Sequence, residues 1–144
     1  MTDVFDKAKR SAVMSRIRGK NTIPERSVRS LLYRLGYRFR LHCRELPGNP
    51  DIVLPGRRTV IFVNGCFWHR HARCRYATTP ATRRDFWKRK FFANVERDKR
   101  NQARLRRSRW RVLVIWECQI LKPETLAARI VRFLGPASTL GTRN

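Results

Sequence analysis

Two parts of the sequence hold side chains of types that can bind metal ions. Asp51 follows Pro50 at the start of a predicted strand, and its carboxylate is the kind of hard oxygen ligand that Mg²⁺ prefers. Residues 64–81 hold most of the cysteines and histidines and show little hydrophobic periodicity. We therefore expect a bound metal, more than hydrophobic packing, to shape this segment.

The setting of the four cysteines favours metal binding over disulfides. The N-terminus begins with charged residues, and the longest apolar runs, 60–63 and 112–116, are too short to span a membrane. We therefore expect a cytoplasmic protein, in a compartment that keeps thiols reduced. Free cysteines in a packed core are the alternative.

The charge of the chain indicates a polyanionic partner. Lys and Arg number 34 against 10 Asp and Glu, a formal net charge of +24. Such a chain repels itself unless a polyanion binds it, and nucleic acid is the first candidate. An anionic membrane surface is less favoured, because no segment pairs a clean apolar face with a purely basic one.

The pattern of apolar residues predicts an α/β fold. Thr22 and Glu25 form a T-x-x-E capping box, and helical periodicity follows until Gly36. Further apolar runs predict strands at 37–41, 51–54, 59–63 and 112–116, and helices at about 83–107 and 123–134. This order predicts a mixed central β-sheet flanked by helices.

The chain is expected to form one domain between two tails. Residues 1–21 are basic with few apolar side chains, which indicates an arm that orders on its partner. Residues 22–134 form the predicted domain, and 135–144 are expected to be a flexible tail. The inward-facing candidates in the long helix are Phe86, Phe91, Val95 and Leu105.

The strand that begins at Asp51 resembles part of the PD-(D/E)xK core of restriction-endonuclease-like enzymes. In those nucleases an aspartate at this position binds Mg²⁺, and a water of the ion can attack phosphorus. The second strand departs from their pattern, because residues 62–65 read Phe-Val-Asn-Gly in place of the usual acid and lysine. A Pro-Asp pair that only caps a strand is the alternative.

Longer motifs point to a narrower family. They are Gly65-Cys66-Phe67-Trp68-His69, Pro80-Ala81-Thr82-Arg83, Asn94-Val95-Glu96-Arg97-Asp98, and the run from Trp110 to Cys118. With Pro50-Asp51 upstream, they occur in the order and at nearly the spacing of the very short patch repair (Vsr) DNA mismatch endonucleases. The sequence resembles that family from Asp3 to Cys118.

The resemblance implies a set of catalytic residues. Asp51 would bind Mg²⁺ together with the main-chain carbonyl of Val63, and Glu25 would reach the ion through a water. His69 would activate the attacking water, with Asp98 orienting its imidazole, a division of labour that suits a base that titrates near neutral pH. Two alternatives stay open: Glu25 as a helix cap only, and His69 as a zinc ligand.

The resemblance also implies a structural zinc site. Its ligands would be Cys66, His71, Cys74 and Cys118, a Cys₃His set. One residue more than is usual in the family lies between His71 and Cys74, so Cys43 is an alternative ligand. Asn64 replaces a histidine that some members carry, which leaves the number of Mg²⁺ ions open.

Aromatic side chains are expected to contact the bases of DNA. By the resemblance, Phe67, Trp68 and Trp87 would enter the base stack beside the mismatch, and Met14 on the arm would wedge from the other side. Wedging costs least where pairing is already imperfect, so it favours a mismatch. A purely structural role in the core is equally weighted for Trp87. Basic residues on the long helix would contact phosphates.

The function implied by the resemblance is nicking of the T-containing strand at T:G mismatches left by deaminated 5-methylcytosine. One active site in a monomer cuts one strand per binding event. Mismatch-repair factors and a repair DNA polymerase are the implied partners. Two other functions remain: a dimeric restriction endonuclease of the same fold class, and a non-catalytic zinc-stabilised nucleic-acid-binding module.

Overall fold

The computed structural model describes residues 22–137. The predicted arm at 1–21, including Met14, and residues 138–144 lie outside this range. The described elements are α2 (Ile23–Arg34), β1 (Arg40–Leu41), β2 (Ile52–Leu54), a 3₁₀ turn (Pro55–Arg57), β3 (Thr59–Asn64), α3 (Arg84–Arg107), β4 (Arg111–Trp116), a second 3₁₀ turn (Glu117–Leu121) and α4 (Pro123–Leu134).

The strands form one mixed sheet in the order β1-β2-β3-β4. β1 pairs antiparallel with β2, and β2 antiparallel with β3, with Ile52 opposite Ile61. β4 then pairs in parallel with β3 along six residues, after a crossover through α3. The mixed α/β fold expected from the sequence is confirmed.

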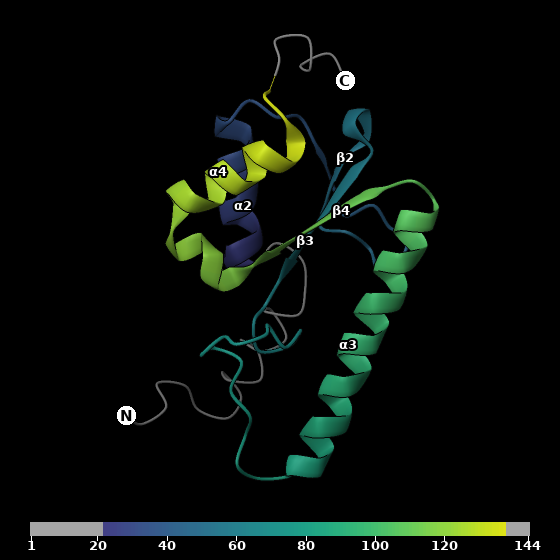
Figure 1. Ribbon diagram of the computed structural model, residues 1–144, viewed down its shortest axis with the longest axis vertical. Helices are drawn as coiled ribbons and strands as arrows, with labels where there is room; N and C mark the ends of the chain where they lie inside the picture. The colour runs from purple at the N-terminus through teal and green to yellow at the C-terminus, as the bar shows by residue number, and fades with distance from the viewer. Residues whose placement is uncertain (1–21, 138–144) are drawn as a thin grey trace.

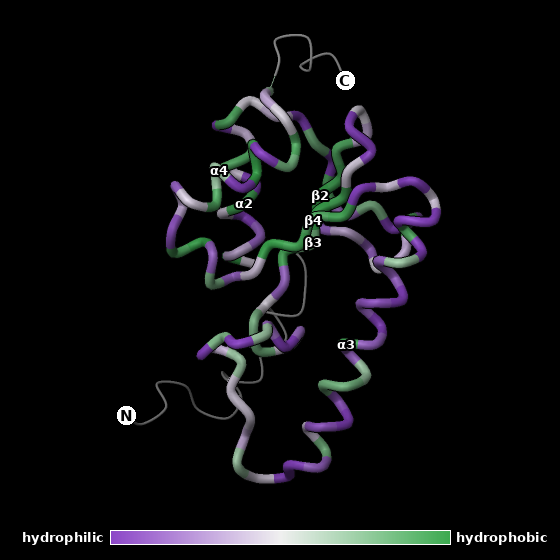
Figure 2. Tube along the Cα trace, viewed as in Figure 1, coloured by the Kyte–Doolittle hydropathy of each residue, from purple (hydrophilic) through white to green (hydrophobic). Residues whose placement is uncertain are grey.

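Helices cover both faces of the sheet (Figure 1). Alternation along each strand sends one set of apolar side chains to each face. One set packs with α2 and α4 in the larger core, which includes Leu32, Ile61, Ile115 and Ile130. The other set, with Val60 and Val112, packs with Leu105 of α3 in a smaller core. Figure 2 shows the apolar strands between the two helical layers.

The helix boundaries follow from local chemistry. The Thr22 hydroxyl accepts a hydrogen bond from the Glu25 N–H at 3.3 Å, and Gly36 has a φ of +95° just after α2. Pro123 occupies the first turn of α4, where the absence of an N–H costs nothing. The capping box and Gly36 are the signals from which α2 was predicted.

The first strand is shorter than the predicted 37–41. Only Arg40 and Leu41 pair with β2, at the edge of the sheet. Tyr37 turns away instead, is buried, and donates its hydroxyl to the Gly135 carbonyl. Arg57 likewise donates to the carbonyls of Leu134 and Pro136. Residues 135–137 of the predicted tail therefore lie against the domain.

The first half of α3 extends beyond the sheet (Figure 1). Phe91 and Leu105 are buried as predicted, but Phe86 is 37% exposed. The prediction for Phe86 is therefore wrong, because helical periodicity gives the face of a side chain and not the length of the partner surface. Among the described residues, no helix is long and apolar enough to cross a membrane.

Candidate active site and metal centres

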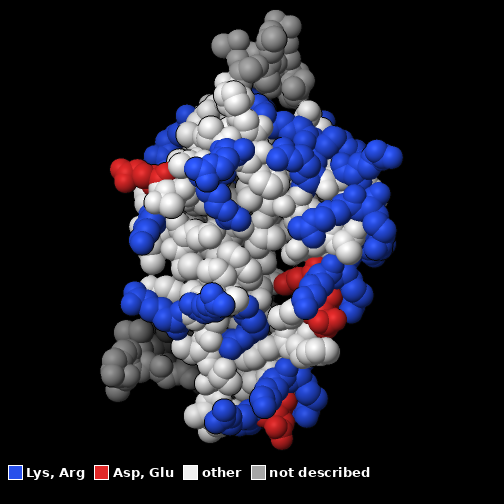
Figure 3. Space-filling view, viewed as in Figure 1, with Lys and Arg blue, Asp and Glu red and all other residues white. Residues whose placement is uncertain are grey.

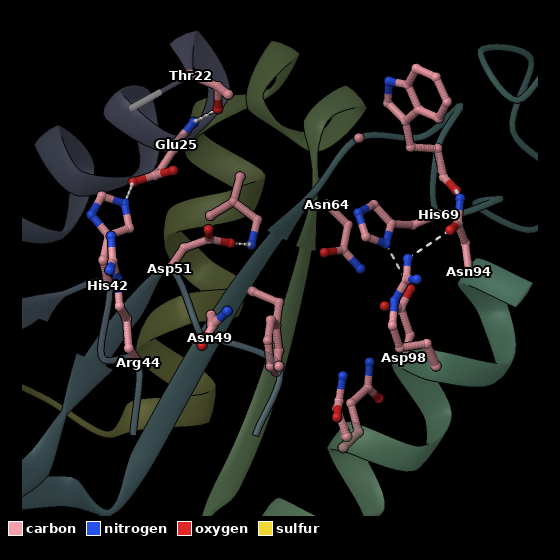
Figure 4. A pocket seen from close by; sticks show the side chains of 18 residues that line it. Thr22, Glu25, His42, Arg44, Asn49, Asp51, Asn64, His69, Asn94 and Asp98 are labelled. Atoms are coloured by element: carbon pink, nitrogen blue, oxygen red, sulfur yellow. Dashed lines mark hydrogen bonds and ion pairs between the residues drawn. The ribbon is translucent and has the colours of Figure 1, made fainter. Parts of the chain in front are cut away.

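The candidate active site is a cavity of about 480 Å³ between the first turn of α2, the ends of β2 and β3, and α3. Figure 4 shows Glu25, His42 and Asp51 on one side of it and His69 and Asp98 on the other. The four predicted catalytic residues, Asp51, His69, Glu25 and Asp98, all line this cavity. Segments far apart in the sequence thus bring titratable groups to one place.

Asp51 lies directly before β2, where antiparallel pairing holds its backbone. Its carboxylate accepts a 2.7 Å hydrogen bond from the Val63 N–H on β3. Burial, together with the nearby Glu25 carboxylate, raises the pKa of this carboxyl to about 6, although the Val63 hydrogen bond acts in the opposite direction. A buried acid with a like charge beside it is stabilised in its ionised form by a bound cation.

Glu25 takes part in the N-terminal cap of α2 and also lines the cavity. Its main-chain N–H is bound by Thr22, while its side chain, 2% exposed, reaches His42, with 2.5 Å between Oε2 and Nε2. Arg29 lies 3.8 Å from the same oxygen. The main-chain cap therefore leaves the carboxylate available for the cavity.

His42 is a site residue that the sequence analysis missed. Its main-chain N–H donates to the Asp51 carbonyl at 3.2 Å, one step beyond the pairing of Leu41 with Ile52. A signal existed, because an antiparallel pairing of the first two predicted strands places the residue after Leu41 opposite Asp51. Ligand atoms of Glu25, His42 and Asp51 lie within 4.8 Å of one another.

His69 and Asp98 form a pair on the opposite wall. The His69 Nδ1 lies 2.6 Å from Oδ2 of Asp98, which α3 presents one turn after Asn94. A carboxylate on Nδ1 leaves Nε2 as the nitrogen that can accept a proton. His69 is not part of the Cys/His cluster described next, so its alternative as a metal ligand there is not supported.

The four predicted zinc ligands lie close together in the structure. Cys66, His71, Cys74 and Cys118 have ligand atoms within 4.8 Å of one another. The His71 Nδ1 lies 3.6 Å from the Cys66 sulfur and 3.4 Å from the Cys118 sulfur. In a tetrahedral zinc site, with a Zn–N bond of about 2.1 Å and a Zn–S bond of about 2.3 Å, the nitrogen and a sulfur lie roughly 3.5 Å apart. The cluster therefore fits a tetrahedral metal ion.

Electrostatics in the cluster also fit a cation. Burial raises the pKa of the Cys66 thiol to about 12, so a positive ion is needed to hold it as a thiolate. Burial, helped by Arg129, lowers the pKa of His71 and keeps it neutral, as a metal ligand must be. The His71 ring also stacks on Trp116, 4.3 Å between centroids, which fixes its orientation.

The additional residue before Cys74 is absorbed by the backbone. Arg73 has a φ of +59°, a left-handed turn that brings Cys74 back to the cluster. Cys43, the alternative ligand, lies elsewhere: its thiol donates to Glu45, and it packs against the smaller core. Sequence spacing could not distinguish the two arrangements, because the turn depends on the conformation of one residue.

Arg70 stabilises the loop that carries His69 through contacts within the loop itself. This guanidinium donates to the carbonyls of Phe67, Ala77 and Thr78, and it lies 3.8 Å from the centroid of the Phe91 ring. The main-chain N–H of Cys66 donates to Glu117 at 3.0 Å. Contacts from both ends of the loop thus fix the position of His69.

The three aromatic residues predicted to meet DNA form one cluster with Phe91. Ring centroids lie 5.0 Å apart for Phe67 and Trp68, and 5.7 Å apart for Phe67 and Trp87. Trp68 is 9% exposed and also lines the cavity, and the side-chain amide of Asn94 donates to its carbonyl. The cluster thus connects the cavity to the exposed part of α3.

Basic side chains cover much of the face seen in Figure 3, and acidic ones form only small patches. Exposed basic residues occur along α3, whose residues are strongly hydrophilic over most of their length (Figure 2). Such a surface attracts the phosphate backbone of nucleic acid.

The fold and the cavity together define a class of protein. The catalytic domain of the homing endonuclease I-Bth0305I has the same fold, with a TM-score of 0.56 over 78% of this chain and 94% of that domain, at 24% identity. The mixed sheet, with a buried aspartate at one strand and a histidine beyond the next, is restriction-endonuclease-like. Its fold is that of a DNA endonuclease catalytic domain.

Sequence comparisons give the family. Residues 2–75 match the family model for DNA mismatch endonuclease Vsr. The chain is 49% identical over 137 residues to the type II nicking enzyme V.XorIIP of Xanthomonas oryzae pv. oryzae, covering 95% of this chain and all of that one. It is 47% identical over 126 residues to DNA mismatch endonuclease Vsr of Escherichia coli, covering 88% and 80%. The chain belongs to the Vsr family and is a DNA endonuclease.

Proposed function

We propose that the protein nicks the T-containing strand at T:G mismatches that arise from deaminated 5-methylcytosine, and so starts very short patch repair in the cytoplasm. The observation that carries this proposal is the single cavity that joins Asp51 to the His69–Asp98 pair in a chain of the Vsr family. The names of two relatives, a nicking enzyme and a mismatch endonuclease, agree with it.

The histidine pair would move the proton of the attacking water. Asp98 holds Nδ1 of His69, so Nε2 accepts the proton as the water attacks phosphorus. The same carboxylate stabilises the imidazolium that results. The bond from phosphorus to the leaving sugar oxygen breaks, and that oxygen takes a proton from solvent water. In this proposal Asp98 is a positioning residue, and His69 is the general base.

Asp51 and the main-chain carbonyl of Val63 would hold the catalytic Mg²⁺, with Glu25 beside them. The fit rests on the buried carboxylate of Glu25 and the half-buried carboxylate of Asp51, which line one cavity, and on the raised pKa of Asp51. When bound, Mg²⁺ supplies positive charge for the phosphate oxygens and lowers the pKa of water. Cys66, His71, Cys74 and Cys118 would hold a structural Zn²⁺ that fixes the His69 loop.

Preference for a mismatch would come from the aromatic cluster. Trp68 lines the cavity, and the rings of Phe67 and Trp87 pack against it. Driving such rings into a base stack costs roughly a few kcal/mol per step. That cost is lowest at a mispaired step, so T:G is favoured over C:G. Met14, outside the described residues, would wedge from the opposite side.

One site per monomer accounts for a nick in one strand, and mismatch-repair factors and a repair DNA polymerase would act on the product. The test uses end-labelled duplexes that differ only in T:G or C:G within a cytosine-5 methyltransferase site. Wild-type protein with Mg²⁺ should nick only the T strand of the T:G duplex. The Asp51→Ala and His69→Ala variants should bind the duplex without cutting it.

Other outcomes assign other functions. Cleavage of both strands of the C:G duplex by a dimer would assign a restriction endonuclease. Binding that is equal for wild type and Asp51→Ala, without cleavage in either, would assign a non-catalytic binding module.

A further inference from the structure

His42 occupies a position from which it can contact the cation of the active site. It follows the edge strand β1 with a φ of +50°, and its main-chain N–H is bound to the Asp51 carbonyl. This turn points the imidazole into the cavity, where its Nε2 meets the Glu25 carboxylate, and the side chain is 17% exposed. In Figure 4 the His42 ring, Glu25 and Asp51 surround one common space.

These three residues offer one nitrogen and two carboxylate groups within 4.8 Å of one another. Glu25 already has a cation nearby, because Arg29 lies 3.8 Å from its Oε2. The Glu25 carboxylate therefore has a positively charged neighbour other than His42. An imidazole beside two carboxylates is the arrangement of a mixed nitrogen and oxygen metal site.

We propose that His42 is a direct nitrogen ligand of the divalent cation bound at Asp51, and that it makes this site prefer Mn²⁺ and Co²⁺ to Mg²⁺. The inference rests on the proposed metal-dependent function and adds a ligand and a metal preference to it. Mg²⁺ favours oxygen ligands and gains little from an imidazole, whereas first-row transition ions bind nitrogen readily. Removal of His42 should therefore affect Mn²⁺ more than Mg²⁺.

The test measures cation binding directly, on zinc-loaded full-length protein so that the cysteine cluster is already filled. Pulsed electron paramagnetic resonance of one equivalent of Mn²⁺ should show coupling to an imidazole nitrogen in the wild type. The coupling should change to that of ¹⁵N when the protein contains ¹⁵N-histidine. Because that measurement needs no substitution, it stands even if a variant fails to fold.

Two variants assign the nitrogen. His42→Gln keeps a side chain that can donate a hydrogen bond to Glu25 but lacks the imidazole, so it should lose the coupling. His69→Gln, on the opposite wall, is the matched control and should retain it. By calorimetry, His42→Gln should weaken Mn²⁺ binding by about tenfold or more and Mg²⁺ binding by less than about threefold.

The outcomes separate this inference from the proposed function. If the wild type binds Mn²⁺ in an Asp51-dependent manner and nicks DNA, but shows no imidazole coupling, the inference is overturned and the proposed function stands. An equal loss of Mn²⁺ and Mg²⁺ affinity in His42→Gln would reduce His42 to a positioning residue for Glu25. If neither cation binds the wild type, both the inference and the metal-dependent function fail.

Discussion

The carboxyl of Asp51 would bind a cation in its ionised form, whereas its burial favours the protonated form. In the unfolded chain an aspartate ionises near pH 4, whereas burial raises the pKa of Asp51 to about 6. The folded state therefore binds this proton more tightly than the unfolded state. The carboxyl favours folding below about pH 4, and this contribution is lost as the pH rises through 6.

Asp51→Asn should therefore stabilise the protein at neutral pH while it abolishes cleavage. The shift of about two pKa units sets an upper limit of about 3 kcal/mol, and we expect a gain of about 1–2 kcal/mol at pH 7 without added Mg²⁺. Urea unfolding at pH 7 and pH 4 measures it. Asp85→Asn, at an exposed carboxylate of α3, is the control. An equal gain at both pH values would contradict the assignment.

Asp98→Asn tests the tautomer of His69. The amide can donate to Nδ1, which would leave the proton on Nε2, where it prevents the ring from acting as a base. We expect the single-turnover nicking rate to fall by about 100-fold or more, with DNA affinity changed less than threefold. Equal losses of rate and affinity would instead indicate a damaged binding surface.

At the scale of elements, the segment between β3 and α3 carries most of the chemistry without regular secondary structure. Three of the four cysteine-cluster ligands lie in it, and the fourth, Cys118, follows β4. Parallel pairing of β3 with β4 brings the ends of these two strands together. The sheet thus supplies the geometry of the cluster, and the cluster fixes the loop.

Metal analysis should find one zinc per chain, lost in Cys66→Ser. Loss of the metal frees the loop that holds His69, so we expect nicking to be abolished and amide hydrogen exchange of residues 65–83 to accelerate. The β-sheet amides serve as an internal control and should remain protected, because their cores do not include this loop. A variant that exchanges uniformly fast would show that the metal stabilises the whole fold.

Arg70→Lys should loosen the same loop without touching the metal cluster. Lysine keeps the charge, but its N–H groups all lie on one nitrogen and cannot span the carbonyls of Phe67, Ala77 and Thr78 as the guanidinium does. We expect a loss of about 1–3 kcal/mol in the free energy of unfolding. Arg75→Lys, an exposed neighbour, is the control, and equal losses in both would argue against a specific role for Arg70.

Local signals in the sequence predicted the elements, and non-local contacts account for what was missed. The capping box at Thr22 predicted the start of α2 correctly, because its chemistry acts within one turn. Tyr37 left its predicted strand for a carbonyl near the other end of the chain, and His42 joined the site through its pairing opposite Asp51. No local periodicity reports such contacts.

For the whole molecule, charge dominates the interaction with DNA. A net charge of +24 makes binding strongly dependent on salt, because each phosphate contact releases counterions. Arg44 lines the cavity, whereas Arg132 is exposed on α4. We expect Arg44→Gln to reduce the slope of the logarithm of the binding constant against the logarithm of salt concentration by about one unit. Arg132→Gln should leave this slope unchanged. Fluorescence anisotropy from about 50 to 200 mM salt measures both. Equal slopes for both variants would place DNA elsewhere.

The hydrogen bond from the Cys66 main chain to Glu117 and the parallel β3–β4 ladder have a consequence for biosynthesis. Both connect early residues to residues made much later, and such distant pairings form slowly. On the ribosome, Asp51 and His69 emerge well before Glu117 and Cys118. A nascent chain therefore carries the catalytic side chains without the strand that aligns them. We therefore expect nuclease activity to begin only after nearly the whole domain has left the exit tunnel.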